Sequence, residues 1–159
     1  MALIKLNNQS LTAVTSLPSG VGGKILQVVS ATHSSATTTS STSYVDTGIT
    51  VNITPSATSS KIYVITNILG ISSVNATTSA VSLQLLQDAT KVAETINVGF
   101  GDTAQENQGI TLQTLDSPNT TSQLTYKVQF KNRESASVGI NGSSDTSKIT
   151  AFEVGAWQI

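Results

Sequence analysis

Apolar and polar residues alternate along short stretches of the chain after residue 24. The stretches TGITVNIT (47–54) and LTYKVQF (124–130) alternate strictly, with a period of two residues. A period of two is typical of antiparallel strands that have one face in a core and the other in solvent. The alternation therefore predicts half-buried antiparallel strands at both places.

Other stretches are more apolar. SAVSLQLL places Val81, Leu83 and Leu85 on one face, and GITLQTL repeats this pattern less strictly. KIYVITNILGI (61–71) is apolar on both faces, which is typical of a strand that is covered on both sides. We expect residues 61–71 to form a central strand or a strand that faces another subunit.

Clusters of turn-forming residues separate these stretches. Ser, Asn, Gly and Pro gather between them, at the roughly 8 to 14 residue spacing that is typical of β-sandwiches. No stretch after residue 24 has a helical period. We therefore predict an all-β fold, an antiparallel, jelly-roll-like β-sandwich of about eight or nine strands. The pattern does not determine the order of the strands.

The first 23 residues differ from the rest of the chain. Their apolar residues are spaced too loosely for a strand, and the Gly-rich stretch PSGVGG follows them. We divide the chain into an N-terminal arm with a joint (1–23) and a β-sandwich domain (24–159). Because exposed aliphatic side chains promote association, we expect the arm to be buried against another protein. The expected attachment residues are Leu3, Ile4, Leu6, Leu11, Val14 and Leu17.

Charge is scarce along the chain. Charged residues make up 11% of it, with 8 Lys plus Arg against 9 Asp plus Glu, whereas about a quarter is usual. This balance argues against nucleic acid as a partner, because phosphate binding needs clustered basic residues. No apolar stretch is long enough to span a membrane. The absence of Cys excludes disulfides and Cys-ligated metals, and we expect no cofactor.

Asp46-Thr47-Gly48 spells the tripeptide of aspartic proteases, in which two carboxylates share a proton and activate water. In those enzymes the tripeptide lies in a loop after an apolar strand. Here it runs directly into an alternating stretch, and a turn-forming Asp with a Gly explains it equally well. We favour the structural interpretation.

Two other candidate sites are weak. His33 is the only histidine and lies in a polar stretch without a Gly-x-Ser-x-Gly motif nearby, so we expect an exposed loop residue rather than a catalytic base. The stretch GFGD, with Glu106 a few residues later, offers two carboxylates in a Gly-rich loop but lacks the spacing of a calcium loop. We expect neither a metal site nor an enzyme.

Trp157, the single tryptophan, lies near the end of the chain after ITAFEVGA. Aromatic rings stack on sugars in carbohydrate-binding modules, but no second ring accompanies this one in the sequence. A tryptophan at the end of a last strand more often closes a core or a subunit contact. We favour that role and keep glycan binding as an alternative.

Two strings in the first half of the chain carry a resemblance. LNNQSLTAVTSLPSGVGGKILQVVSATHSS and TSSTSYVDTGITVNITPSATSSKIYVITN resemble a group of short virion-associated proteins of tailed bacteriophages. In that group a similar NNQSL start leads through a Gly-rich joint into a GK-[IV]-LQVV strand and an ITPSSTSNKI-like hairpin. The second half of the chain agrees only in style, through LLQDATK and TYKVQ.

The resemblance implies a trimeric fibre, knob or decoration protein on a phage particle, made in the cytoplasm of the host bacterium. The absence of a long shaft or a repeat favours a compact capsid decoration or cement protein, which the arm attaches to the major capsid protein or another virion protein. One alternative is a short tail fibre or adhesin that binds a host receptor. An alternative of another class is a carbohydrate-binding module that binds a host surface glycan.

Overall fold

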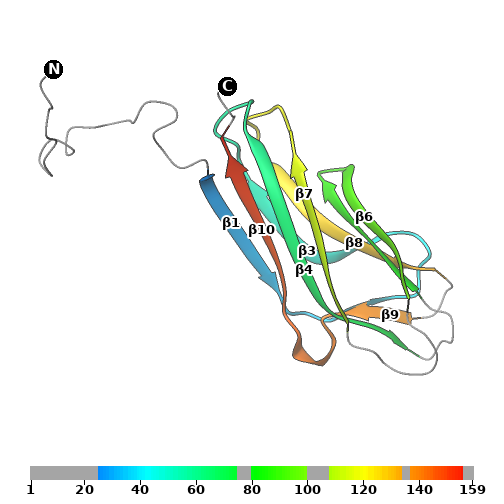
Figure 1. Cartoon of the computed structure of the whole chain (residues 1–159). Coiled ribbons are helices and arrows are strands. Elements are labelled where there is room, and N and C mark those ends of the chain that lie inside the picture. Colours follow the sequence, from blue (N-terminus) through cyan, green and yellow to red (C-terminus); the bar gives the residue numbers. More distant parts are fainter. Residues whose placement is uncertain (1–24, 75–79, 100–107, 134–136, 156–159) are drawn as a thin grey trace, which may run out of the picture.

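The structure is a computed structural model of the chain, and it describes residues 25–74, 80–99, 108–133 and 137–155. These residues form ten β-strands and one short 3₁₀ turn, with no α-helix among them (Figure 1). The elements are β1 (Ile25–His33), β2 (Thr37–Thr39), β3 (Val45–Ile53), β4 (Lys61–Val74), β5 (Ala80–Gln87), β6 (Thr90–Gly99), β7 (Gln108–Asp116), β8 (Leu124–Asn132), β9 (Ser137–Ile140), η1 (Gly142–Ser144) and β10 (Ser147–Val154).

The strands form two antiparallel sheets that pack face to face (Figure 1). In the first sheet β1 pairs with β10, β10 with β4, and β4 with β7. β2 continues the line of β1, and β9 continues the line of β10, where they pair with each other and β9 pairs with β4. The second sheet has the order β3-β8-β5-β6. If β1 with β2, and β9 with β10, are each counted as one interrupted strand, the described residues form eight strands. The order is then first-eighth-third-sixth in one sheet and second-seventh-fourth-fifth in the other. This is the jelly-roll order, and the predicted fold class is confirmed.

The core lies between the two sheets and consists of the inward-pointing residue of each alternating pair. Along β8 every second residue from Leu124 to Phe130 is buried, and the inward residues of β3 follow the same rule. The predicted inner face of β5, formed by Val81, Leu83 and Leu85, is completely buried. The strict alternation in the sequence thus identified the core side of these strands correctly.

β4 is the longest strand and the centre of the first sheet. It pairs with β10 through Lys61–Asn67 and with β9 through Ser72–Val74, while β7 lies along its other side. Gly70 lies where the pairing partner of β4 changes from β10 to β9, and its φ of 62° is unfavourable for residues other than glycine. The sequence prediction of a central strand over residues 61–71 is confirmed.

Asn141 ties the two interrupted strands together. Its side-chain amide donates hydrogen bonds to the carbonyl oxygens of His33 and Ser35 between β1 and β2. Its side-chain oxygen accepts one from the Ser147 hydroxyl, and its backbone N–H donates to the Leu69 carbonyl in β4. Asn141 is buried, and these bonds satisfy the polar groups of a side chain that would otherwise be costly to bury.

A buried carboxylate fixes the opposite end of the first sheet. Glu153 of β10 has no exposed surface and accepts hydrogen bonds from the Ser56 N–H, the Ser56 and Ser60 hydroxyls, and the Gln27 amide, at 2.5 to 2.7 Å. Burial alone would raise the pKa of Glu153, but these donors outweigh it and lower the pKa below its ordinary value. The carboxylate joins β1 and the β3–β4 loop to β10.

Candidate assembly interface

The outer face of the first sheet carries a row of apolar side chains across all four long strands. The strand register places Val28 opposite Phe152, Phe152 opposite Tyr63, and Tyr63 opposite Leu115. Residues that lie directly opposite each other point to the same face of a sheet. Their inward neighbours Ala151 and Val64 are completely buried, so this row points away from the core.

Three further apolar side chains extend the row. Leu26 of β1 lies against Gly155 at the end of β10, next to the outward-pointing Val154, and Ile65 follows Tyr63 two residues along β4. We call this surface the apolar face, and its members are Leu26, Val28, Tyr63, Ile65, Leu115, Phe152 and Val154. Leu26, Val28 and Leu115 are between 51% and 56% exposed, so a single copy of the chain leaves much apolar surface in water.

Two of these side chains hold each other in place. The Tyr63 and Phe152 rings lie 6.0 Å apart at an angle of 38°, within the range of favourable aromatic pairs. The Tyr63 hydroxyl donates a hydrogen bond of 2.5 Å to the Gln113 side-chain oxygen on β7. The side chains at the centre of the apolar face therefore contact one another within a single copy.

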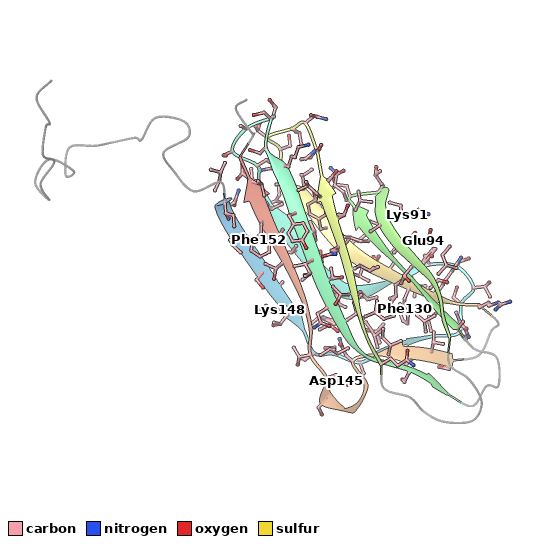
Figure 2. All side chains as sticks on the ribbon, in the orientation of Figure 1. Lys91, Glu94, Phe130, Asp145, Lys148 and Phe152 are labelled. Carbon is pink, nitrogen blue, oxygen red and sulfur yellow. The ribbon has the colours of Figure 1, made fainter. Side chains whose placement is uncertain are left out.

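Charge is confined to the borders of the apolar face. Lys148 lies on β10 four residues before Phe152, on the same face but in the other half of the strand (Figure 2). Lys61 lies beyond Tyr63 at the start of β4, and its ammonium donates a 2.8 Å hydrogen bond to the Ser117 hydroxyl. Within the described residues these strands point no acidic side chain outward from this face.

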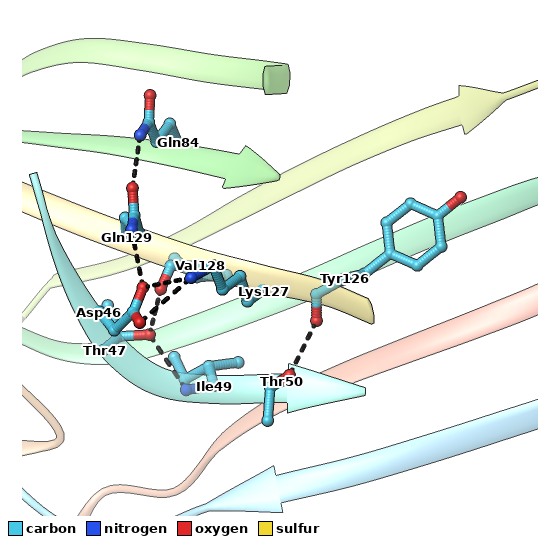
Figure 3. Close-up of polar contacts among 9 residues, drawn as sticks. All are labelled: Asp46, Thr47, Ile49, Thr50, Gln84, Tyr126, Lys127, Val128 and Gln129. Atoms are coloured by element: carbon cyan, nitrogen blue, oxygen red, sulfur yellow. Dashed lines mark hydrogen bonds and ion pairs between the residues drawn. The ribbon is translucent and has the colours of Figure 1, made fainter. Parts of the chain in front are cut away.

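The outer face of the second sheet carries a row of polar side chains. The register aligns Asp46, Gln129, Gln84 and Glu94 in one row across β3, β8, β5 and β6. The Gln129 amide donates to Asp46 at 2.7 Å, and the Gln84 amide donates to the Gln129 oxygen at 2.7 Å (Figure 3). We call this surface the polar face; it also carries Tyr44, Lys91, Lys127 and Lys131.

Asp46 is an ordinary member of the polar face. Its carboxylate lies 3.0 Å from the Lys127 ammonium and accepts the Gln129 hydrogen bond (Figure 3). The Gln129 bond, together with Lys127, lowers the pKa of Asp46 although partial burial opposes the change. A shallow hollow of about 170 Å³ beside it is lined by residues of β3 and β8, namely Asp46, Gly48, Ile49, Thr50, Lys127 and Val128. Asp46 is paired with a cation rather than with a second carboxylate, unlike in the protease arrangement.

Thr47 and Gly48 form a bulge rather than the turn that the sequence suggested. The four residue steps from Asp46 to Thr50 along β3 lie opposite only two steps along β8, from Gln129 to Lys127. Gly48 takes up the extra length with a φ of 86°. The Thr47 hydroxyl donates to the Val128 carbonyl and accepts from the Ile49 N–H (Figure 3). The tripeptide therefore has a structural role in β3.

The expectation for His33 is wrong. His33 is not an exposed loop residue but the last residue of β1, half-buried, with its ring against Gly48 of β3. A Cβ at Gly48 would lie 2.5 Å from the ring, so this contact requires glycine. The ring Nε2 is buried, and no hydrogen-bond partner for it is present among the described residues. The low-complexity sequence around His33 concealed the end of a strand.

Several candidate residues lie outside the described residues. These are the attachment residues Leu3, Ile4, Leu6, Leu11, Val14 and Leu17, the possible glycan or subunit contact Trp157, and the Gly-rich loop with Asp102 and Glu106. Over the ranges that the structure does describe, no group of three or more His, Asp or Glu side chains gathers in a way that could hold a metal ion. The same part of the chain contains no helix of the length and apolar character needed to cross a membrane.

Sequence reasoning missed the apolar face as a unit. The only signal was that some strands are apolar on both sides, which we noted for KIYVITNILGI but not for ILQVV or AFEV. Joining these signals needs the register, because Val28 and Phe152 are far apart in the sequence and adjacent in the sheet.

Comparisons with known proteins give no assignment to a family. No protein-family model matches the chain, and no curated protein is similar to it. Among solved structures, the VP2 subviral particle of infectious bursal disease virus matches 82% of this chain with 12% identity and a TM-score of 0.44. The T=1 particles derived from the same virus match 82% of this chain with 14% identity and a TM-score of 0.43. The chain spans 38% and 36% of the length of those chains.

Proposed function

We propose that this chain is a structural protein of a bacteriophage virion, a trimeric decoration or cement protein without enzymatic activity. Residues 1–23 attach it to the major capsid protein or to another virion protein, and the jelly roll is displayed on the particle. The chain is synthesised in the cytoplasm of the host bacterium and then joins the virion.

Three observations support this proposal. The first half of the chain resembles virion-associated proteins of tailed phages in the strings quoted above. The jelly roll is an architecture used by viral capsid proteins, although lectins and cupins share it. Asp46, the best candidate for a catalytic residue in the sequence, is engaged by Lys127 and Gln129.

The observation that carries the proposal is the contrast between the two outer faces. An apolar face that is free of acidic residues suits contact with other protein. A polar face whose side chains bond to each other suits long exposure to water. A subunit of a particle needs one surface of each kind.

The test uses the full chain and particles of the virus that encodes it. One variant replaces Leu3, Leu6, Leu11 and Leu17 with Ser, and the control replaces Asn7, Asn8, Gln9 and Thr12 with Ser. Four buried leucines contribute on the order of 6 kcal/mol, so the first variant should bind particles at least about ten-thousandfold more weakly. Its thermal melting should be unchanged, because the jelly-roll core lies within residues 25–155.

Sedimentation of purified particles followed by quantification of the bound chain measures the effect. We expect the control to sediment like the wild type and the leucine variant to remain in the supernatant. Absence of the wild-type chain from purified particles would exclude a virion role. Electron microscopy of labelled particles then separates the capsid location from the alternative, a short tail fibre.

A further inference from the structure

We infer that the apolar face is the contact through which copies of this chain bind one another. This inference deepens the proposed function, because it assigns the subunit contact of the displayed oligomer to the outer surface of β1, β10, β4 and β7. The occupant of the apolar face is a neighbouring copy of the same jelly roll.

The charge distribution selects such a partner. The apolar face has no acidic side chain, and its two lysines, Lys61 and Lys148, lie at its borders. A partner with a charged surface would lose hydration on this face without gaining an ion pair. A second copy brings an equally uncharged surface, so both surfaces gain by leaving water.

The size of the apolar face favours a ring over a simple dimer. Four strands at about 4.8 Å, and five positions at about 3.3 Å between the level of Val154 and that of Ile65, outline roughly 300 Å². A stable pair buries about 800 Å² per partner, so one face-to-face contact is small. Around a three-fold axis the apolar face of each copy can contact the apolar faces of two neighbours, so that all three faces leave water together. Ile25 at the start of β1, 57% exposed, adds apolar surface at the rim.

The apolar face is also prepared for binding. Tyr63 and Phe152 are already packed together, and the Tyr63 hydroxyl is bonded to Gln113. Both side chains belong to inner strands of a hydrogen-bonded sheet. Little side-chain freedom remains to be lost on association, which reduces the entropic cost of binding.

The first experiment changes two exposed residues at opposite edges of the apolar face. Val28→Glu and Leu115→Glu are combined in the full chain, and the matched control is Ile96→Glu. Ile96 is 63% exposed on β6 of the second sheet. Size-exclusion chromatography with light scattering over a concentration series measures the oligomer. All three chains should have similar circular dichroism, since each replaced side chain is more than half exposed.

We expect the wild type and Ile96→Glu to form the same oligomer. The double variant should dissociate with a dissociation constant raised at least about a hundredfold, because each change removes apolar burial and places a carboxylate in the contact.

A second experiment does not depend on weakening the contact. The chain contains no cysteine, so Leu115→Cys introduces a single thiol on the apolar face, and Ile96→Cys introduces one elsewhere. A short bis-maleimide should join copies of the Leu115→Cys chain at low micromolar concentration. The Ile96→Cys chain should remain at least about tenfold less cross-linked, because its thiol lies outside the contact.

Several outcomes would overturn the inference. One is a monomeric wild type at tens of micromolar, which would mean that the chain's own N-terminal arm or a foreign protein covers the apolar face. Another is a double variant that associates like the wild type, or equal cross-linking from both positions. A dimer or trimer that the double variant dissolves supports the inference. These solution results are independent of particle sedimentation, so failure of the virion role is recognised separately.

Discussion

The outer faces of the two sheets are both formed by the outward residues of antiparallel strands, but they differ in the side chains that they expose. The apolar face lies on β1, β10, β4 and β7 of the first sheet, and the polar face lies on β3, β8, β5 and β6 of the second. On the polar face, Asp46, Gln129 and Gln84 bond to one another across three strands. On the apolar face, the corresponding central row, from Val28 to Leu115, is aliphatic and aromatic.

The side chains of the polar face find their partners within a single copy, whereas those of the apolar face remain exposed in a single copy. Glu94 on the polar face is held by Lys91 and by the Tyr44 hydroxyl, and the Lys131 ammonium lies 4.5 Å from the centre of the Tyr44 ring. Changes on the polar face should therefore affect folding slightly and association not at all. Changes on the apolar face should affect association and leave the fold intact.

The largest expected effect comes from a change that disrupts β4, the central strand of the sheet that carries the apolar face. In Gly70→Ala the new Cβ would lie 2.6 Å from the backbone nitrogen of Gly142, at a φ of 62°. Backbone cannot move aside as a side chain can, so we expect a loss of about 3 kcal/mol or more in the free energy of unfolding. Gly155→Ala is the control, since its nearest neighbour would lie 3.5 Å away. Urea unfolding of both variants measures the difference, and equal stability would contradict this account of β4.

The next effect concerns the buried carboxylate that joins β1 to β10. Glu153→Gln keeps the shape but removes the charge that four donors share, so we expect a loss of about 2 kcal/mol. The folded-state pKa of Glu153 is lowered. The carboxylate therefore contributes its full share to the free energy of unfolding above the unfolded-state pKa of about 4.3, and this share is lost as the pH falls from there through the lowered folded-state pKa. Unfolding measured from pH 7 to pH 2 should therefore show a shallower acid decline in the variant. Glu94→Gln on the polar face should lower the free energy of unfolding much less. An equal loss would contradict a particular stabilising role for the buried hydrogen bonds to Glu153.

A smaller effect distinguishes the two faces through protein concentration. If copies associate through the apolar face, the midpoint of thermal unfolding should rise by about 3 °C for each tenfold increase in concentration. The same series with Val28→Glu and Leu115→Glu combined should give a constant midpoint, whereas Ile96→Glu should follow the wild type. A midpoint that is independent of concentration in the wild type would remove the distinction between the faces.

The smallest effect is expected on the polar face. Gln129→Ala removes the hydrogen bonds to Asp46 and from Gln84, but water can replace both at this half-buried position. We expect a loss of about 0.5 to 1 kcal/mol and an unchanged oligomer by light scattering. Dissociation of the oligomer by this change would show that the polar face also takes part in assembly.

The sequence alone determined where several strands lie and which of their sides enters the core. The alternation in TGITVNIT and LTYKVQF is a local property, and the structure places these stretches in β3 and β8 with the expected residues buried. The all-β sandwich followed from the same pattern and from the turn-forming clusters between the strands. The role of the N-terminal arm and of Trp157 stays a prediction, because both lie outside the described residues.

Only the tertiary structure decided which strands are neighbours and what their outer faces present. Val28, Tyr63, Leu115 and Phe152 come from four distant parts of the chain, and each alone is an unremarkable exposed or half-buried residue. The register brings them into one row, and a slip of one residue in any strand would turn its member into the core. The same holds for His33, whose contact with Gly48 depends on two strands that belong to different sheets. Hydrophobic periodicity is set by neighbours in the sequence, whereas a surface is set by neighbours in space.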